Sequence, residues 1–165
     1  MDIGYIGAGT DLVQRMQAAG MRVFACGVDT ANSLPNAVAV ARALSAPRVV
    51  CLDLPEGFAT ELAIQDVWPE CAPGDAVVDF AGGTPADGRR RADALASVRM
   101  HFIDAYVQRD EAGLALRVGG HADAVRAVAA LLDALCGSGR WTHCGPPGSG
   151  YHSAMDGGFM GATRR

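Results

Sequence analysis

The sequence contains no lysine, since all 14 of its basic residues are arginine. These 165 residues therefore supply neither a Schiff-base lysine nor a lysine general base. Arginines cluster only at 89–91 and 164–165, and the net charge is -4. A chain without a basic stripe cannot neutralise a run of phosphates, so we expect no nucleic-acid partner.

Long apolar runs and paired cysteines are also missing. No run approaches the roughly 20 residues that span a bilayer, and the start lacks the basic and apolar regions of a signal peptide. We therefore expect a cytoplasmic protein with no membrane partner. The cysteines include no Cys-x-x-Cys pair, which favours reduced, mostly buried thiols over disulfides or a metal site. The five cysteines are Cys26, Cys51, Cys71, Cys136 and Cys144.

The sequence does have an alternation of short apolar strands and helices, within the length of one domain. This alternation predicts an α/β fold with a Rossmann-like, doubly wound and mainly parallel sheet, trimmed after the second strand. The expected strands are 1–6, 21–26, 48–54, 76–80, 101–105 and 114–120. The expected helices are 12–19, 36–44, 86–96 and 122–135, and the last is strongly amphipathic.

The stretch "YIGAGTDLVQRM" (residues 5–16) predicts a strand, a glycine turn and a helix, which is the arrangement that seats a dinucleotide pyrophosphate. Gly7 supports the tight turn, and Gly9 leaves room for a phosphate next to Thr10. Asp11 stands in the first helical turn, where we expect its carboxylate to compete with a ligand for the free backbone N–H groups. The alternative role of Asp11 is a plain cap on an empty helix end.

Further pieces follow this turn in a fixed order: "APRVVCLDLPEG", "GDAVVDFAGG", "RRRADAL", "HFIDA", "LRVGG" and "HCGPPGSG". With them the chain resembles the 6-phosphogluconate dehydrogenase family, and most closely its decarboxylating enzymes. The resemblance implies an NAD(P)-binding Rossmann-like domain over residues 1–145. It also implies a large helical domain afterwards, in whose place we expect only a glycine-rich tail over residues 146–165.

The sequence departs from the family pattern where the resemblance implies chemistry. Leu12 replaces the third glycine of the turn. Gly27 stands where the family often carries an acidic ribose ligand, and Asp29 is its substitute if the loop bends back. Gly82 in "DFAGG" replaces the asparagine that contacts substrate, and Ala154 replaces the catalytic lysine. The family's oxidative decarboxylation is therefore expected to be lost.

Three carboxylates fall at the carboxyl ends of expected parallel strands, where ligands of open α/β sheets bind. These are Asp53, Asp79 and Asp104. Paired acids at that edge act as general acid and base or hold a hard cation. The alternative for all three is a cap or a hydrogen bond within a loop.

The tail adds Tyr151, His152 and Asp156 as candidate catalytic groups. His152 would be a general base near neutral pH, oriented by Tyr151 or Asp156. The glycines that follow argue for a mobile terminus instead, which holds a base poorly unless a partner subunit orders it.

Three functions remain open. The leading hypothesis is a family member that has lost its dehydrogenase chemistry and serves a different small-molecule reaction at the strand-end crevice. The alternatives are a minimal NAD(P)-dependent oxidoreductase and a non-catalytic binding or regulatory protein. NAD or NADP is the candidate cofactor, with Gly7, Gly9, Thr10 and Asp29 as its ligands. Without a helical companion domain apolar surface is left uncovered, so we expect a homodimer, with the tail crossing to the second subunit.

Overall fold

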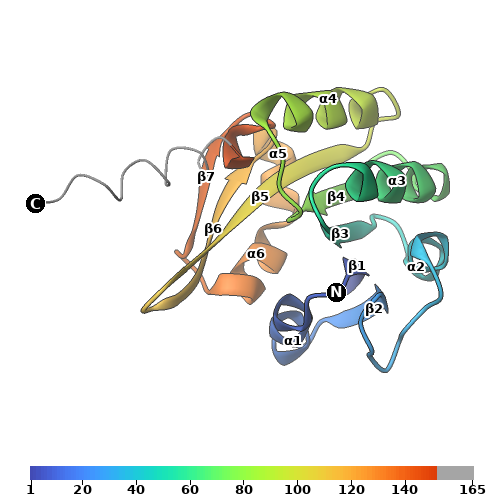
Figure 1. The fold of residues 1–165 in the computed structure, drawn as a ribbon, viewed down its shortest axis with the longest axis horizontal. Coiled ribbons are helices and arrows are strands. Elements are labelled where there is room, and N and C mark those ends of the chain that lie inside the picture. The colour runs from blue at the N-terminus through green and yellow to red at the C-terminus, as the bar shows by residue number, and fades with distance from the viewer. Residues whose placement is uncertain (152–165) are drawn as a thin grey trace, which may run out of the picture.

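The computed structural model of the chain describes residues 1–151, which build one seven-stranded sheet (Figure 1). The strands are β1 (Asp2–Gly7), β2 (Arg22–Cys26), β3 (Val49–Asp53), β4 (Ala76–Asp79), β5 (His101–Asp110), β6 (Gly113–Gly119) and β7 (Trp141–Gly145). Their order is β2-β1-β3-β4-β5-β6-β7. The first five run parallel, β6 is antiparallel to β5, and β7 is parallel to β6. The predicted Rossmann-like, mainly parallel sheet is confirmed.

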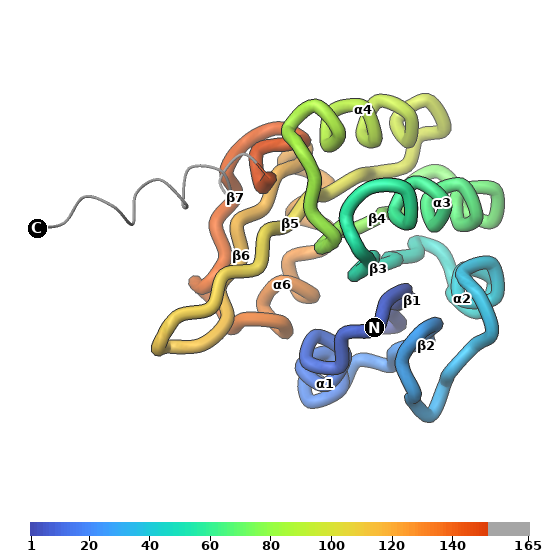
Figure 2. The backbone as a smooth tube through the Cα atoms, in the orientation of Figure 1, coloured from blue at the N-terminus to red at the C-terminus, as the bar shows by residue number. Residues whose placement is uncertain are grey.

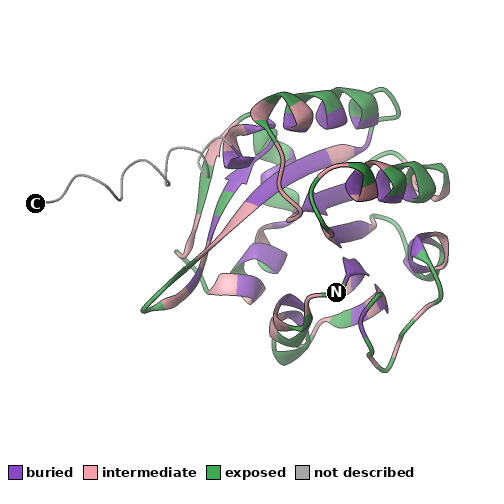
Figure 3. Cartoon of the chain, viewed as in Figure 1, coloured by how far each residue is buried: buried purple, intermediate pink, exposed green. Residues whose placement is uncertain are grey.

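Helices cover both faces of this sheet (Figure 1). One face carries α1 (Thr10–Ala18), α5 (Ala122–Ala127) and α6 (Ala129–Cys136), and the other carries α2 (Ala37–Ala43), α3 (Phe58–Val67) and α4 (Pro85–Ala96). A short 3-10 helix, Trp68–Glu70, follows α3. Figure 3 shows the buried residues gathered on the strands and on the inner sides of the helices.

The two apolar cores follow from the alternation of side chains along each strand. On β1, Ile3 and Tyr5 pack with the helices of the α1 face, whereas Ile6 packs with those of the α2 face. Leu12, which stands at the third-glycine position, is buried in the core of the α1 face. Both faces of the parallel strands are thus covered, as a parallel sheet requires.

The carboxyl ends of the parallel strands lie at one edge of the sheet. Gly7 of β1 pairs with Asp53 of β3, and Asp79 of β4 pairs with Asp104 of β5. Beyond this level β5 continues to Asp110 and turns back as β6, so that the hairpin projects past its parallel neighbours (Figure 2). The three predicted strand-end carboxylates therefore do lie on neighbouring strands, with the hairpin beside them.

Four elements differ from the sequence prediction. The strand expected at 101–105 runs on for five residues because β6 pairs with it as far as Asp110. The helix expected at 122–135 is broken at Val128, whose φ of -103° and ψ of 8° leave the α region while its side chain is fully buried. The helix α3 was not predicted, and neither was β7, whose "WTHCG" sequence is half-exposed and lies at the edge of the sheet.

The thiols are less buried than the sequence suggested. Cys51 on β3 is fully buried, whereas the other four cysteines are half-buried. Among residues 1–151, no helix combines the length and the apolar character needed to cross a membrane.

Candidate functional site

The glycine turn between β1 and α1 is closed by the backbone of its neighbours. A Cβ on Gly7 would lie 2.2 Å from the carbonyl oxygen of Asp53, and Gly7 has a positive φ of 156°. A Cβ on Gly27, at the end of β2, would lie 2.5 Å from the carbonyl oxygen of Gly7. The ends of β1, β2 and β3 thus approach so closely that only glycine fits at both positions.

Asp53 lies directly beneath the turn. The Tyr5 hydroxyl is 2.5 Å from Asp53 Oδ2 and 2.8 Å from the carbonyl oxygen of Gly9, so it links the two. Burial, together with the neighbouring Asp53 carboxylate, raises the pKa of Tyr5 far above its usual value and keeps this hydroxyl protonated. A Cβ on Gly9 would lie 2.3 Å from Asp53 Oδ2. Asp53 therefore supports the floor of the turn.

The first turn of α1 opens on a cavity of about 300 Å³. The cavity is lined by Gly9, Thr10, Asp11, Leu12, Asp53, Phe80, Val107 and Arg109. The Asp11 carboxylate accepts hydrogen bonds from Arg109 Nη2 at 2.7 Å and from Arg15 Nε at 3.1 Å. These hydrogen bonds, with that from Arg109 dominant, lower the pKa of Asp11 and keep it ionised.

The position of Asp11 corrects one expectation. Asp11 was expected to occupy the backbone N–H groups at the start of α1, but its carboxylate faces the two arginines instead. Within residues 1–151, no side chain accepts a hydrogen bond from the first-turn N–H groups of α1. The helix end therefore keeps its N–H donors for an anion, and Arg109 from the β5–β6 hairpin lies beside it, paired with Asp11.

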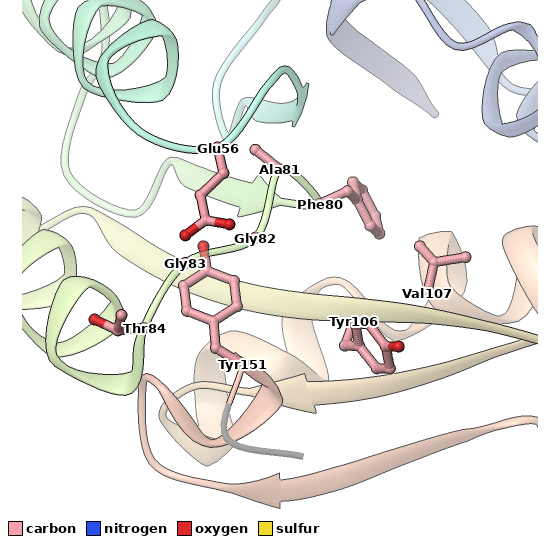
Figure 4. A pocket seen from close by; sticks show the side chains of 9 residues that line it. All are labelled: Glu56, Phe80, Ala81, Gly82, Gly83, Thr84, Tyr106, Val107 and Tyr151. Carbon is pink, nitrogen blue, oxygen red and sulfur yellow. The ribbon is translucent and has the colours of Figure 1, made fainter. Parts of the chain in front are cut away.

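A second cavity, of about 540 Å³, adjoins the first and shares Phe80 and Val107 with it. We call it the larger cavity (Figure 4). Its walls come from the loop after β3, the loop after β4, the projecting part of β5 and the start of the C-terminal segment. The lining residues are Glu56, Phe80, Ala81, Gly82, Gly83, Thr84, Tyr106, Val107 and Tyr151.

Asp79 is fully buried behind this cavity. It accepts hydrogen bonds from the backbone N–H of Ala81 at 2.8 Å, from Arg91 Nη1 at 3.0 Å and from the Tyr151 hydroxyl. Burial raises the pKa of Asp79 to about 6, although the hydrogen bonds from Tyr151, Ala81 and Arg91 oppose the shift. Arg91, which is 3% exposed, also donates to Glu61 from Nε at 2.9 Å. Asp79, Tyr151 and Arg91 thus form one closed polar cluster.

Asp104 holds the segment that carries Tyr151. Its carboxylate accepts the backbone N–H of Gly148 at 2.7 Å and that of Tyr151 at 3.0 Å. Burial raises the pKa of Asp104, and these backbone donors oppose the shift. The three candidate carboxylates therefore face different partners: Asp53 the glycine turn, Asp79 the Tyr151 cluster, and Asp104 the loop before Tyr151. They do not converge on one acid–base pair or cation site.

The remaining candidates are placed as follows. Asp29 is exposed on the loop after β2, two residues beyond the contact between Gly27 and Gly7. Tyr151 lines the larger cavity, and its ring is buried. His152 and Asp156 lie outside the described residues.

Sequence reasoning missed four residues that line the cavities: Glu56, Phe80, Tyr106 and Arg109. Glu56 and Phe80 lie within the pieces "APRVVCLDLPEG" and "GDAVVDFAGG" but were given no role there, and Tyr106 and Arg109 sit on the unpredicted extension of β5. The available signal was the polar and apolar alternation of "YVQRD", which continues the strand pattern past Ala105.

A parallel sheet with helices on both faces, and a glycine turn leading into an open helix N-terminus, define a Rossmann-type nucleotide-binding domain. The family model of the "NAD binding domain of 6-phosphogluconate dehydrogenase" matches residues 2–145. The chain belongs to this family, as the sequence resemblance indicated.

Curated relatives agree with this assignment. The decarboxylating 6-phosphogluconate dehydrogenase of Staphylococcus aureus is 32% identical over 121 residues, which are 68% of this chain and 26% of the relative. The NADP(+)-dependent decarboxylating enzyme of Bacillus subtilis is 30% identical over 122 residues, 69% of this chain and 26% of the relative. The match thus spans about a quarter of the length of these relatives.

Solved structures share the fold at lower identity. The 3-hydroxyisobutyrate dehydrogenase of Mycobacterium tuberculosis superposes with a TM-score of 0.82 at 21% identity, covering 96% of this chain and 59% of that one. An imine reductase from Myxococcus stipitatus, solved in complex with NADP+, gives a TM-score of 0.78 at 17% identity, covering 97% and 60%.

Proposed function

We propose that this chain binds a nicotinamide dinucleotide at the glycine turn and serves as the cofactor-binding part of an oxidoreductase. The observation that carries the proposal is the first turn of α1, whose N–H groups donate to no side chain of residues 1–151 and which opens on a cavity that Arg109 lines. A helix N-terminus with an adjacent arginine is a site for phosphate oxygens. The residues present therefore fit the cofactor of the family.

The residues that would hold the cofactor follow from this geometry. Backbone N–H groups at Thr10 and its neighbours, together with Arg109, would bind the pyrophosphate, and Gly9 keeps side-chain bulk away from it. Asp29, beyond β2, is the candidate for the ribose hydroxyls. When bound, the nicotinamide supplies hydride transfer, while the protein contributes binding, orientation and electrostatics.

For the reaction, we propose that the decarboxylating dehydrogenase chemistry of the family is lost and that a different small molecule is handled in the strand-end crevice. Gly82 offers no side chain where the resemblance places a substrate-binding asparagine, and Ala154 replaces the lysine. The buried Asp79 supports this interpretation, because burial raises its pKa and its hydrogen-bond partner Tyr151 lines the larger cavity. The alternatives are a minimal NAD(P)-dependent oxidoreductase of ordinary chemistry and a domain that binds without catalysis.

Calorimetric titration of the chain with NADH and with NADPH tests the binding proposal. Replacing Arg109 with Gln should weaken binding about three- to tenfold, because a charge-assisted hydrogen bond to phosphate is lost. Asp11→Asn should tighten binding, since it removes a negative charge from the site and releases Arg109. The matched control is Arg117→Gln, an exposed arginine of the same hairpin that lines neither cavity. Absence of binding of both nucleotides at millimolar concentration would refute the proposal.

We also propose that the chain forms a homodimer. Large apolar side chains are exposed on and beyond α3: Phe58 is 77% exposed, and Leu62, Trp68 and Val98 are exposed as well. Such surface favours burial against a partner. Sedimentation at micromolar concentration tests this, and a monomer there would contradict it.

A further inference from the structure

The larger cavity carries a single charged side chain, that of Glu56, among the residues 1–151 that line it. Its other polar side chains are the hydroxyl-bearing Thr84, Tyr106 and Tyr151. No arginine or histidine of the described chain lines this cavity. The cavity therefore has a negative electrostatic bias, although the family to which the chain belongs is named for a phosphorylated sugar acid.

The Glu56 carboxylate has no partner within the described part of the chain. No hydrogen bond or ion pair joins it to another residue there, unlike Glu61 and Glu70, which both pair with arginines. Its Oε2 atom would lie 3.8 Å from a Cβ on Gly82, so the carboxylate reaches across the loop that follows β4. Figure 4 shows it on the side of the cavity where the Tyr151 ring lies. An unpaired carboxylate at a cavity wall is free to meet a cation.

The positive charge behind the cavity wall, that of Arg91, is already paired. Arg91 lies behind Tyr151, and its guanidinium hydrogen bonds to Asp79, Glu61, the carbonyl oxygen of Gly82 and the Tyr151 hydroxyl. With 3% exposure it offers no donor to the cavity. An anion placed here would gain nothing from Arg91 and would meet the charge of Glu56.

Aromatic rings complete the lining. Phe80 and Tyr106 face the cavity from the side opposite Glu56 (Figure 4). The faces of aromatic rings attract cations and also pack against apolar groups. One carboxylate, two accessible rings and no free cation are complementary to a ligand with a positive nitrogen beside an apolar body.

We infer that the larger cavity binds a small organic cation, such as an amine that is protonated at neutral pH and carried on an apolar or aromatic group. Glu56 pairs with the nitrogen, and Phe80 and Tyr106 pack on the apolar part. As a substrate site the cavity rests on the proposed dinucleotide function, because it adjoins the turn cavity at Phe80 and Val107. Amine binding itself needs no nucleotide, so the two proposals fail separately.

The test uses three probes of nearly equal shape and different charge: benzylamine, benzyl alcohol and benzoate. Each is titrated at neutral pH, without nucleotide, into the isotope-labelled chain, and amide shifts are followed by NMR, which detects millimolar affinities. We expect benzylamine to bind most tightly and benzoate most weakly. The shifts should map to 80–84 and 106–107.

Two variants separate a specific contact from general charge. Glu56→Gln should weaken benzylamine binding about two- to fivefold, the range for an exposed ion pair, and should leave benzyl alcohol unchanged. Glu111→Gln removes the same charge at the exposed β5–β6 turn, outside the cavity, and should change neither. The inference is overturned if benzoate binds as tightly as benzylamine, if the shifts map elsewhere, or if Glu56→Gln has no more effect than Glu111→Gln.

Discussion

The buried Asp79 makes the pH dependence of stability predictable. Its pKa is raised from an ordinary value of 3.8 to about 6, mainly by burial. Because the folded chain holds this proton more tightly than the unfolded chain, folded Asp79 binds more protons than unfolded Asp79 between these two pH values. Its contribution to the unfolding free energy is therefore largest at low pH and falls as pH rises through about 4 to 6.

The size of this effect follows from the shift. A rise of about two pKa units costs about 3 kcal/mol of unfolding free energy once pH is above both values. Integration of the linkage relation places about 2 kcal/mol of that loss between pH 4.5 and pH 7.5. An uncharged residue of the same shape removes the whole dependence.

Urea unfolding of the parent chain and of Asp79→Asn at pH 4.5 and pH 7.5 measures this contribution of Asp79. The unfolding free energy of Asp79→Asn minus that of the parent chain should be about 2 kcal/mol more positive at pH 7.5 than at pH 4.5. The control is Asp87→Asn at the start of α4, where hydrogen bonds from Thr84 lower the pKa to about 2. That variant should show no such difference between the two pH values, because the stabilisation by ionised Asp87 is nearly complete at pH 4.5 and is lost only in stronger acid. Equal pH dependence of the parent chain and Asp79→Asn would refute the assignment of a raised pKa to Asp79.

Three further substitutions probe the supports of the two cavities. Gly9→Ala places a Cβ 2.3 Å from Asp53 Oδ2, so we expect the unfolding free energy measured in urea to fall by about 1–3 kcal/mol. Adding Asp53→Ala should recover part of this loss, and additive losses in the double variant would contradict the contact. Asp104→Asn replaces one acceptor oxygen by a donor that faces backbone N–H groups, so the amide of Gly148 should exchange with solvent at least tenfold faster, whereas unchanged exchange would exclude this anchoring role. Gly88→Ala brings a Cβ to 2.6 Å from the Cα of Gly148 and should expose the same loop to proteolysis, with Ala86→Gly on the exposed side of α4 as the control.

The fold was predictable because each local pattern agreed with the global one. Buried strands such as "RVVCLDL" have the apolar run that a parallel sheet with two covered faces requires, and the glycine turn marks the first crossover. The helix α3 was not predicted, because "FATELAIQDV" mixes apolar and charged residues without a clear apolar stripe at helical spacing. The edge strand β7 was not predicted, because its pairing with β6, and not a pattern in its own sequence, makes it a strand.

The candidate site was predictable only at the level of position. Strand ends placed Asp53, Asp79 and Asp104 at the correct edge of the sheet, but not the direction in which each carboxylate points. That direction depends on residues far away in sequence, such as Tyr5 for Asp53 and Tyr151 for Asp79. No local pattern reports contacts across 48 or 72 residues.

The buried carboxylates and the cavity charges have separate tasks. Asp104 fixes backbone that forms cavity walls, and Asp53 supports the glycine turn from within the turn cavity. The exposed charges that line the cavities are Arg109, paired with Asp11, at the turn cavity and Glu56 at the larger one. The turn cavity has an arginine beside an open helix end and favours anions. The larger cavity has a carboxylate beside aromatic rings and favours cations. Such a crevice discriminates between ligands by their charge along its length. Exchanging the two charges in the double variant Arg109→Glu, Glu56→Arg should invert the order of the benzylamine and benzoate affinities at the larger cavity. The same variant should abolish dinucleotide binding at the turn.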